Sequence, residues 1–373
     1  MKLKAWKRSK IASILLVFFL ISLITLTGCG GNSNSSSGGS TPEPSQGAED
    51  TSQQVFNLTL AHFQVPLHPV ETILIQDWIK EIDEATGGRV KITSYPGGTL
   101  VPGTEIFESV VSGAVDIGHS AYAYTRGRFP IIETLLIPGL IWPNAKVADW
   151  TVMDLIDELN PEELKDVKHL FSWTTGRGDL LTQKTIKTMD DLKGISIGVT
   201  AAERAEALAK LGASGIVLSM PEQYEALSKG LTQGVVGPMH DLKNVKLADF
   251  LDHVTVTQML YNQVLFMVMN LDTWNSFPPD IQEIFDEVTE KYYREVVAGF
   301  YDWVLADALE WLEEENIELE ITYLSKEEEE KWISLVAPIL DDHVKLLNDK
   351  GLPGDEIIDK IWELIEKNTK LYE

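Results

Sequence analysis

Cysteine is almost absent from this chain, because Cys29 is the single one in 373 residues. With one thiol the chain cannot form an internal disulfide, so a hydrophobic core must stabilise the fold. Basic residues are also scarce: 31 lysines and arginines face 57 acidic residues, and the formal net charge is −26. This balance argues against nucleic acid as a partner, since binding a polyanion requires a basic face.

The sequence also lacks a complete catalytic or metal-binding motif. None of the seven histidines has a zinc-site spacing such as H-E-x-x-H, so no metal and no cofactor are predicted. The segment "GHSAY" (118–122) begins like the G-x-S-x-G turn of serine hydrolases, but Tyr122 stands where the second glycine is required. "GRGDLL" (176–181) lacks the third glycine of a dinucleotide fingerprint. We therefore predict no enzyme and keep a surface hydrolase using Ser120 as an alternative.

The N-terminus carries the pattern of an export signal. Five basic residues fall within the first ten positions, and an almost wholly apolar run follows over 11–26. This run is shorter than the roughly 20 residues of a transmembrane helix and favours a signal peptide over 1–28. The order "LTGC" (26–29) resembles the bacterial lipobox, where cleavage before the cysteine precedes lipidation of its thiol. We expect an exported protein anchored through Cys29 to the cell membrane, facing the periplasm or the cell exterior.

Beyond the signal, the composition changes twice. Residues 29–54 are rich in glycine, serine, proline and glutamine and predict a flexible tether. From Phe56 onward, strand-like alternation and helix-like spacing of apolar residues follow one another repeatedly. Strand-helix-strand order predicts parallel sheets with helices on both faces, an α/β fold. The remaining chain exceeds the commonest domain size, so two lobes are expected.

Two later segments have distinctive patterns. "QVLFMVMN" (263–270) is a continuous apolar run, typical of a strand that is buried on both faces. Beyond Pro279 the pattern is largely helical, and "KEEEEKW" (326–332) predicts a solvated helix face.

Five segments in order resemble the solute-binding proteins of TRAP transporters, the tripartite ATP-independent periplasmic uptake systems. They are "TGGRVKITSYPGGTLVPGTEIFESVVSGAVDIG" (86–118), "YTRGRFPIIETLLIPGL" (124–140), "TMDDLKGISIGV" (188–199), "LGASGIVLSMPEQYEALSKGLTQGVVGP" (211–238) and "MNLDTWNSFPPDIQEIF" (269–285). The resemblance implies a two-lobed periplasmic-binding-protein (Venus flytrap) fold with a hinge and a long C-terminal helix bracing both lobes. It assigns 55–174 and about 262–312 to lobe I, and about 175–261 and 313–373 to lobe II.

The resemblance also implies a function. The protein would capture a small organic acid between its lobes and deliver it to the TRAP membrane subunits, with an aromatic or keto acid among the candidates. A solute sensor for a signalling receptor would use the same fold, and the sequence leaves that alternative open.

The positions of arginine depart from the family pattern. Members usually carry an arginine in the strand after "DLKG", where its planar fork grips a carboxylate; Gly198 stands there in this chain. Gln233 replaces a usual aspartate, and Gly237 replaces the asparagine that often follows. The two glycines predict extra space for a bulkier acid. Arg177 matches a second ligand-facing arginine or a hinge residue, and Arg204 could lean toward the cleft although a solvated surface position is expected.

The other candidates for ligand contact follow strand ends or match family positions near the cleft. Ligands of open α/β sheets bind at the carboxyl ends of the strands. The candidates at strand ends are His62, Phe63, Gln64, Ser120, Tyr122 and Tyr124, and those from the resemblance are Trp173 and Met239. Together they predict a compact pocket lined partly by aromatic rings, while core packing remains an alternative for each residue.

Overall fold

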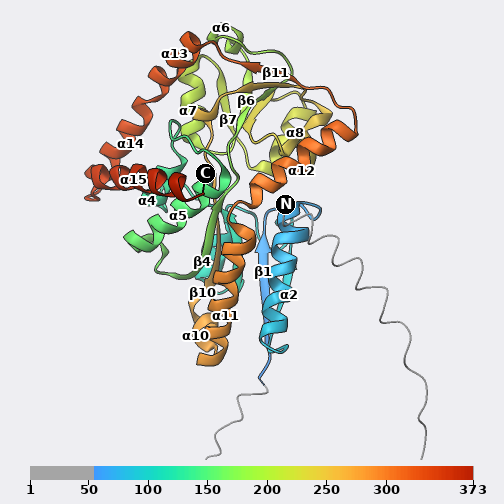
Figure 1. Cartoon of the computed structure of the whole chain (residues 1–373), viewed down its shortest axis with the longest axis vertical. Coiled ribbons are helices and arrows are strands. Elements are labelled where there is room, and N and C mark those ends of the chain that lie inside the picture. The colour runs from blue at the N-terminus through green and yellow to red at the C-terminus, as the bar shows by residue number, and fades with distance from the viewer. Residues whose placement is uncertain (1–53, 373) are drawn as a thin grey trace, which may run out of the picture. The chain divides into compact units, whose positions relative to one another are not determined.

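Two mixed β-sheets organise residues 54–372, the part of the chain that this computed structural model describes (Figure 1). The predicted signal peptide, Cys29 and all of the predicted tether except Gln54 lie outside the described residues. The first sheet has the spatial order β2 (Val90–Tyr95), β1 (Phe56–His62), β3 (Ile117–Ala121), β10 (Val264–Asn270) and β4 (Val167–Thr174). Only β10 runs against its neighbours among these strands.

The second sheet repeats this plan with a different reversed strand. Its order is β11 (Glu320–Tyr323), β9 (His253–Val256), β5 (Asp179–Thr182), β8 (Gly234–Gly237), β6 (Ser196–Val199) and β7 (Ser214–Val217). β5 runs antiparallel to both β8 and β9. The predicted two-lobed α/β fold is confirmed.

Helices connect the strands throughout the described chain. In chain order the longer ones are α2 (Gln76–Ala85), α3 (Ile106–Val111), α5 (Ala145–Leu159), α7 (Ala202–Leu211), α8 (Met220–Ser228), α10 (Leu271–Ser276), α11 (Pro279–Tyr292), α12 (Phe300–Glu314), α13 (Lys326–Val336), α14 (Pro338–Asp349) and α15 (Gly354–Tyr372). The short ones are α4 (Pro130–Glu133), α6 (Met189–Leu192) and α9 (Asp241–Asn244). Within residues 54–372, none of the helices has the length and apolar character needed to cross a membrane.

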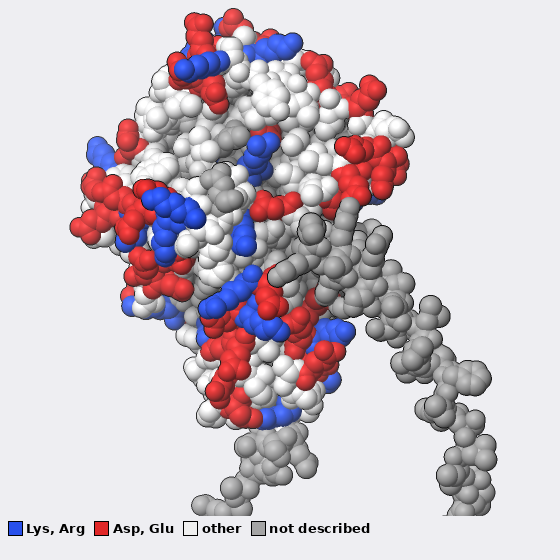
Figure 2. Space-filling view, viewed as in Figure 1, with Lys and Arg blue, Asp and Glu red and all other residues white. Residues whose placement is uncertain are grey.

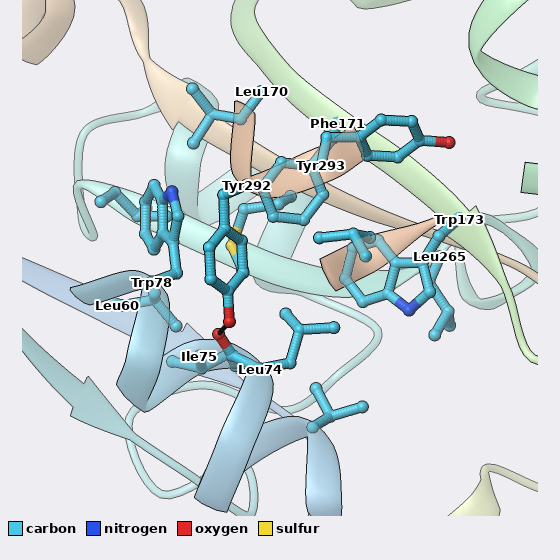
Figure 3. Packing of buried hydrophobic residues seen from close by; sticks show 14 of the residues in the cluster. Leu60, Leu74, Ile75, Trp78, Leu170, Phe171, Trp173, Leu265, Tyr292 and Tyr293 are labelled. Atoms are coloured by element: carbon cyan, nitrogen blue, oxygen red, sulfur yellow. Dashed lines mark hydrogen bonds between the residues drawn. The ribbon is translucent and has the colours of Figure 1, made fainter. Parts of the chain in front are cut away.

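The core beside the first sheet is built from aromatic rings (Figure 3). The fully buried ring of Trp78 on α2 lies edge-on to Phe171 of β4 and Phe285 of α11, with centroids 6.3 and 5.6 Å away. The hydroxyl of Tyr292 donates a hydrogen bond of 2.8 Å to the carbonyl of Leu74. Residues more than 200 positions apart are therefore locked together in this core.

Strand β10 confirms the interpretation of the continuous apolar run, because all seven of its residues are buried. Alternate side chains of a strand point to opposite faces. Met267 accordingly packs in the cluster that contains Trp78, while Phe266 contacts Phe107 of α3 with ring centroids 5.7 Å apart. Helices therefore cover both faces of β10.

The chain passes between the two sheets at 175–178, at 257–263 and along α12. Phe300 and Val304 of α12 pack in the core of the first sheet, and Leu312 packs in a cluster with Leu181 of β5. α12 thus contacts both lobes.

A buried carboxyl joins two of these passages. Asp149 of α5 accepts hydrogen bonds from the amide and the hydroxyl of Thr174, at 2.6 and 2.8 Å, and from the amide of Gly299 at 2.8 Å. Burial raises the pKa of Asp149 to about 8. The end of β4 and the start of α12 are therefore tied to one side chain.

The C-terminal segment 313–373, assigned to lobe II from the resemblance, divides its contacts. β11 pairs with β9 in the second sheet, and α13 packs against α7. α15, however, packs against α5 beside the first sheet. The lobe boundaries stay a prediction, and this packing argues for moving 354–372 to lobe I.

Candidate functional site

A narrow cavity of about 410 Å³, open mouth included, lies where strand ends of the two sheets meet. Its wall combines aromatic rings, neutral polar side chains, two imidazoles and one carboxylate. The lining residues are Phe63, Gln64, His68, Tyr124, Thr175, Thr200, Met220, Gln223, Val236, Gly237, Pro238, His240, Asp241, Tyr261, Gln263, Leu265 and Tyr301. Such a mixture suits a small organic molecule oriented by a few polar groups.

The carboxyl ends of parallel strands supply much of this wall. Phe63 and Gln64 follow β1, Thr200 follows β6, and Asp241 follows β8 by four residues. Of the predicted candidates, Phe63, Gln64 and Tyr124 line the cavity. The expectation that ligands bind at strand ends therefore picked out three residues that border this cavity, all of them from the first sheet.

Two predicted candidates on the first sheet use their polar atoms within the fold. His62 is fully buried and its Nε2 lies 2.8 Å from Oε2 of Glu71. Ser120 is buried and donates a 2.7 Å hydrogen bond to the carbonyl of Gly103. Neither lines the cavity, and the hydroxyl of Ser120 bonds to main chain rather than to a histidine that could activate it.

Tyr122 and Trp173 are core residues as well. The hydroxyl of Tyr122 lies 2.9 Å from that of Ser172, and its ring belongs to the cluster around Phe107. Trp173 is fully buried and stacks on His119 with centroids 4.8 Å apart. The alternative of core packing describes both residues.

Tyr124 lies at the junction of the lobes. It belongs to the short turn η3 (Tyr122–Tyr124) after β3, and its hydroxyl accepts a 3.0 Å hydrogen bond from the amide of Met220 at the start of α8. Burial raises the pKa of Tyr124 well above its ordinary value. A neutral phenol therefore links the first sheet to the second-sheet helix.

Arg204 is not where the sequence placed it. The expected solvated position is wrong, because only 1% of the residue is exposed. It lies in the first turn of α7, which packs toward the passage 257–263. Its Nη atoms donate to the Thr200 hydroxyl, to the carbonyl of Asn262 and to Oε1 of Gln263, and its guanidinium lies 4.5 Å from the ring centroid of Tyr261.

The partners of Arg204 are all neutral. Its Nε has no hydrogen-bond partner, and no carboxylate among residues 54–372 forms an ion pair with it. Burial lowers the pKa of Arg204 from its ordinary value, which reflects the cost of a cation removed from water. Thr200 and Gln263 line the cavity, so the guanidinium lies directly behind its wall. An anion entering the cavity could supply the missing charge.

Arg177 lies outside this cavity. It borders a neighbouring space of about 490 Å³ together with Asn144 and Asp302. Thr175, His240 and Tyr301 border both spaces. The stacked rings of His240 and Tyr301, whose centroids are 4.8 Å apart, are part of the wall between Arg177 and the cavity described above.

Gly198 does not border the cavity, so the predicted extra space at this position does not enlarge it. A Cβ there would make ordinary van der Waals contacts, at 3.4 Å with Cγ1 of Val235 and at 3.6 Å with Cγ of Gln223. Gly237 does border the cavity. Met239 is buried and packs in the cluster that contains Leu181 instead of lining the cavity.

Sequence reasoning missed several lining residues. His240 and Asp241 follow β8. The expectation that ligands bind at strand ends was applied to β1 and β3, and applying it to β8 as well would have found these two residues. Tyr301 lies on α12 and His68 precedes a helical turn, and neither position has a local signal. Within residues 54–372, no group of histidine, cysteine, aspartate and glutamate side chains has the arrangement of a metal site.

Comparison with known proteins agrees with this architecture. The profile of DctP, the bacterial extracellular solute-binding protein family 7, matches residues 60–346. The monocarboxylate 2-oxoacid-binding periplasmic protein of Nostoc sp. is 29% identical over 224 residues, which cover 56% of this chain and 59% of that protein. The chain thus spans less than two thirds of that relative.

Two solved structures are similar over most of the described chain. A TRAP periplasmic solute-binding protein from Bordetella bronchiseptica with bound (R)- and (S)-mandelate is 26% identical, with a TM-score of 0.75, covering 83% of this chain and 99% of that one. A TRAP solute-binding protein from Rhodoferax ferrireducens with copurified benzoate is 23% identical, with a TM-score of 0.78, covering 86% and 100%. The profile match over most of the chain and these likenesses lead to one conclusion: the chain belongs to the DctP family of bacterial extracellular solute-binding proteins.

Proposed function

We propose that this protein is the extracytoplasmic receptor of a TRAP transporter and that it binds a small organic acid through Arg204. The observation that carries the proposal is a buried guanidinium that forms no ion pair in the described chain, directly behind the wall of the cavity. Arginine binds carboxylates well because its planar fork donates two parallel hydrogen bonds. Arg204 would therefore perform the task that the family usually gives to an arginine at the position of Gly198.

The surface charge increases the importance of this one cation. Acidic side chains form several patches on the face shown in Figure 2. Glu313, Glu314 and Glu315 at the end of α12 are among the exposed acidic residues. An organic anion therefore approaches a molecule whose overall charge repels it. Binding depends on a local positive site, and Arg204 is the buried arginine next to the cavity.

The similar proteins support an organic acid as the ligand. One relative is named for monocarboxylate 2-oxoacids, and two similar structures hold benzoate and mandelate. Each of these molecules carries one carboxylate. Ligands of the same class are the first to test on this chain.

Further parts of the proposal concern the membrane. We propose lipidation at Cys29, a link over 29–54 and delivery of the ligand to TRAP membrane subunits. Arg177 would support the hinge, because it lies in the passage between β4 and β5. Closure of the lobes would bury the ligand, and the Tyr124–Met220 hydrogen bond would be one contact of the closed state.

A ligand screen by thermal unfolding tests the proposal. Benzoate, mandelate, phenylpyruvate and short aliphatic acids are added to the purified protein, together with the corresponding neutral amides. A ligand at about 100 times its Kd stabilises the folded state by about 2.7 kcal/mol and raises the melting temperature measurably. We expect at least one acid, but not its amide, to raise it, and Arg204→Gln to abolish the effect.

The exposed Arg126 provides the matched control. Its side chain pairs with Glu203 at 3.1 Å and is 68% exposed, so Arg126→Gln removes the same charge from the same neighbourhood without touching the cavity. This variant should keep the response to ligand. A screen in which no acid raises the melting temperature of the unmodified protein would overturn the proposed function.

A further inference from the structure

The second charged group at the cavity is a carboxylate. Asp241 opens α9 just after β8, is 7% exposed, and is the one acidic residue among the described residues that line the cavity. Its Oδ1 lies 3.2 Å from Nδ1 of His240. Within residues 54–372, no lysine or arginine forms an ion pair with it.

Asp241 and Arg204 do not pair with each other, yet their fields overlap. Burial has the largest effect on the pKa of Tyr261 and raises it; Arg204 then lowers that pKa and Asp241 raises it. Both charges also act on Tyr124, where burial again has the largest effect. The two opposite charges therefore act on the same small space, and a ligand held there experiences both.

A second hydrogen-bond acceptor borders the same cavity. Oε1 of Gln64 is buried and has no hydrogen-bond partner, and only 2% of the residue is exposed. A buried acceptor without a donor is costly, so a ligand that donates a hydrogen bond to it gains affinity. Besides the wall residues that contact Arg204, the cavity thus offers two acceptors, the amide oxygen of Gln64 and the carboxylate of Asp241.

From this arrangement we infer that Asp241 sets the ligand class: it favours monocarboxylates that carry a hydroxyl or ammonium donor away from the carboxylate, and it rejects dicarboxylates. The inference rests on the proposed function, with the ligand's carboxylate at Arg204. The far end of the ligand then meets Asp241, where a hydroxyl or ammonium group donates to the carboxylate. A second carboxylate in that place brings two like charges together in a buried site.

Matched ligands test the inference directly. The purified full chain is titrated calorimetrically with meta-hydroxybenzoate, benzoate and isophthalate, which place a donor, a hydrogen and a carboxylate at the same ring position. An aliphatic series of gamma-hydroxybutyrate, butyrate and succinate repeats the comparison with flexible ligands. In the series that binds, we expect the donor-bearing acid to bind most tightly and the dicarboxylate at least about 100-fold more weakly.

The variant Asp241→Asn keeps the shape of the side chain and removes its charge. We expect it to reduce the ratio of the affinities for the donor-bearing acid and the dicarboxylate at least about ten-fold, chiefly because the dicarboxylate binds more tightly. Asp249→Asn is the control, since it makes the same change at an exposed carboxylate whose partner is the Tyr224 hydroxyl at 3.0 Å. It should leave the ratio unchanged.

The outcomes separate the inference from the proposed function. If monocarboxylates bind but dicarboxylates bind equally well, or if Asp241→Asn leaves the ratio unchanged, the inference is overturned and the proposed function stands. If Asp241→Asn does not fold, the order of the ligands on the unmodified protein still decides. If no monocarboxylate of either series binds, both are overturned.

Discussion

The carboxyl edges of the two sheets occupy equivalent places in the fold but differ in chemistry. At the first sheet, His62 contacts Glu71 and Ser120 donates to Gly103, and the acceptor left without a partner at the cavity is the neutral Oε1 of Gln64. At the second sheet, Arg204 lacks an anionic partner among the described residues. The first edge therefore uses its polar groups for stability, whereas the second leaves charge available for a ligand. Substitutions at the first edge should therefore lower mainly the stability of the protein, and substitutions at the second edge should lower mainly its affinity for the ligand.

The largest expected effect belongs to the first edge. Trp173→Ala removes a fully buried ring that stacks on His119, and it should lower the free energy of unfolding by about 3–5 kcal/mol. Urea unfolding measures the change. A loss below about 1 kcal/mol would contradict the view that Trp173 belongs to the core.

At the second edge, Arg204→Gln should weaken binding of an organic acid at least about 100-fold while the free protein stays as stable or becomes more stable. Removing a buried cation that lacks an anion relieves a desolvation cost. Calorimetric titration and urea unfolding of the ligand-free protein measure the two effects. A large loss of stability together with unchanged affinity would contradict this view, because Arg204 would then serve stability rather than ligand binding.

The buried histidines of the first edge predict a pH-dependent effect. Burial lowers the pKa of His119 to about 3, so the unfolded chain binds a proton near pH 6.5 that the folded protein does not bind until far lower pH. The stability that His119 contributes is therefore lost as the pH falls from 6.5 toward 3. The cost of His119→Gln should shrink by about 2 kcal/mol between pH 7 and pH 5. Unfolding curves of both proteins check this, and an equal cost at both pH values would contradict it.

A smaller effect is expected where the edges meet. Tyr124→Phe removes the hydrogen bond to the Met220 amide and should weaken ligand binding about five-fold, which corresponds to about 1 kcal/mol. The unfolding free energy should change by a similar amount or less. Affinity measured by titration is the test, and an effect as large as that of Arg204→Gln would mean that Tyr124 contacts the ligand's charge.

The smallest change is expected from Ser120→Ala. It deletes one hydrogen bond to the Gly103 carbonyl and should cost about 1 kcal/mol of stability with little change in affinity. Unfolding and titration of the same preparation check both values. A large loss of affinity would place Ser120 in the site rather than in the scaffold.

The sequence predicted features that depend on neighbouring residues and missed features that depend on residues far apart in the chain. The burial of β10 could be predicted because a continuous apolar run is a local pattern, and Phe63 and Gln64 could be found because they follow a strand directly. Arg204 could not, because its burial depends on Asn262 and Gln263, 58 and 59 residues away. Local sequence shows a helix start at this arginine, whereas only the folded chain shows the passage that covers it.

The lining by Tyr301 was out of reach for the same reason. It stacks on His240, 61 positions earlier in the chain. Tyr301 lies on α12, and the sequence pattern of this helix indicates only an amphipathic face. The predicted extra space at Gly198 does not reach the cavity, because Val235 of β8 and Gln223 of α8 lie beside this glycine. Single positions could be compared with a family pattern, but their neighbours in space could not.

The central claim is that Arg204 binds the carboxylate of the ligand. A thermodynamic cycle that combines a substitution in the protein with a change in the ligand tests it most directly. The affinities of one acid and of its carboxamide are measured by calorimetry on the unmodified protein and on Arg204→Gln. The account predicts that the substitution weakens the acid at least about 30-fold more than the amide, a coupling of about 2 kcal/mol. Equal losses for the acid and the amide would contradict it, because Arg204 would then support the cavity without binding the charge.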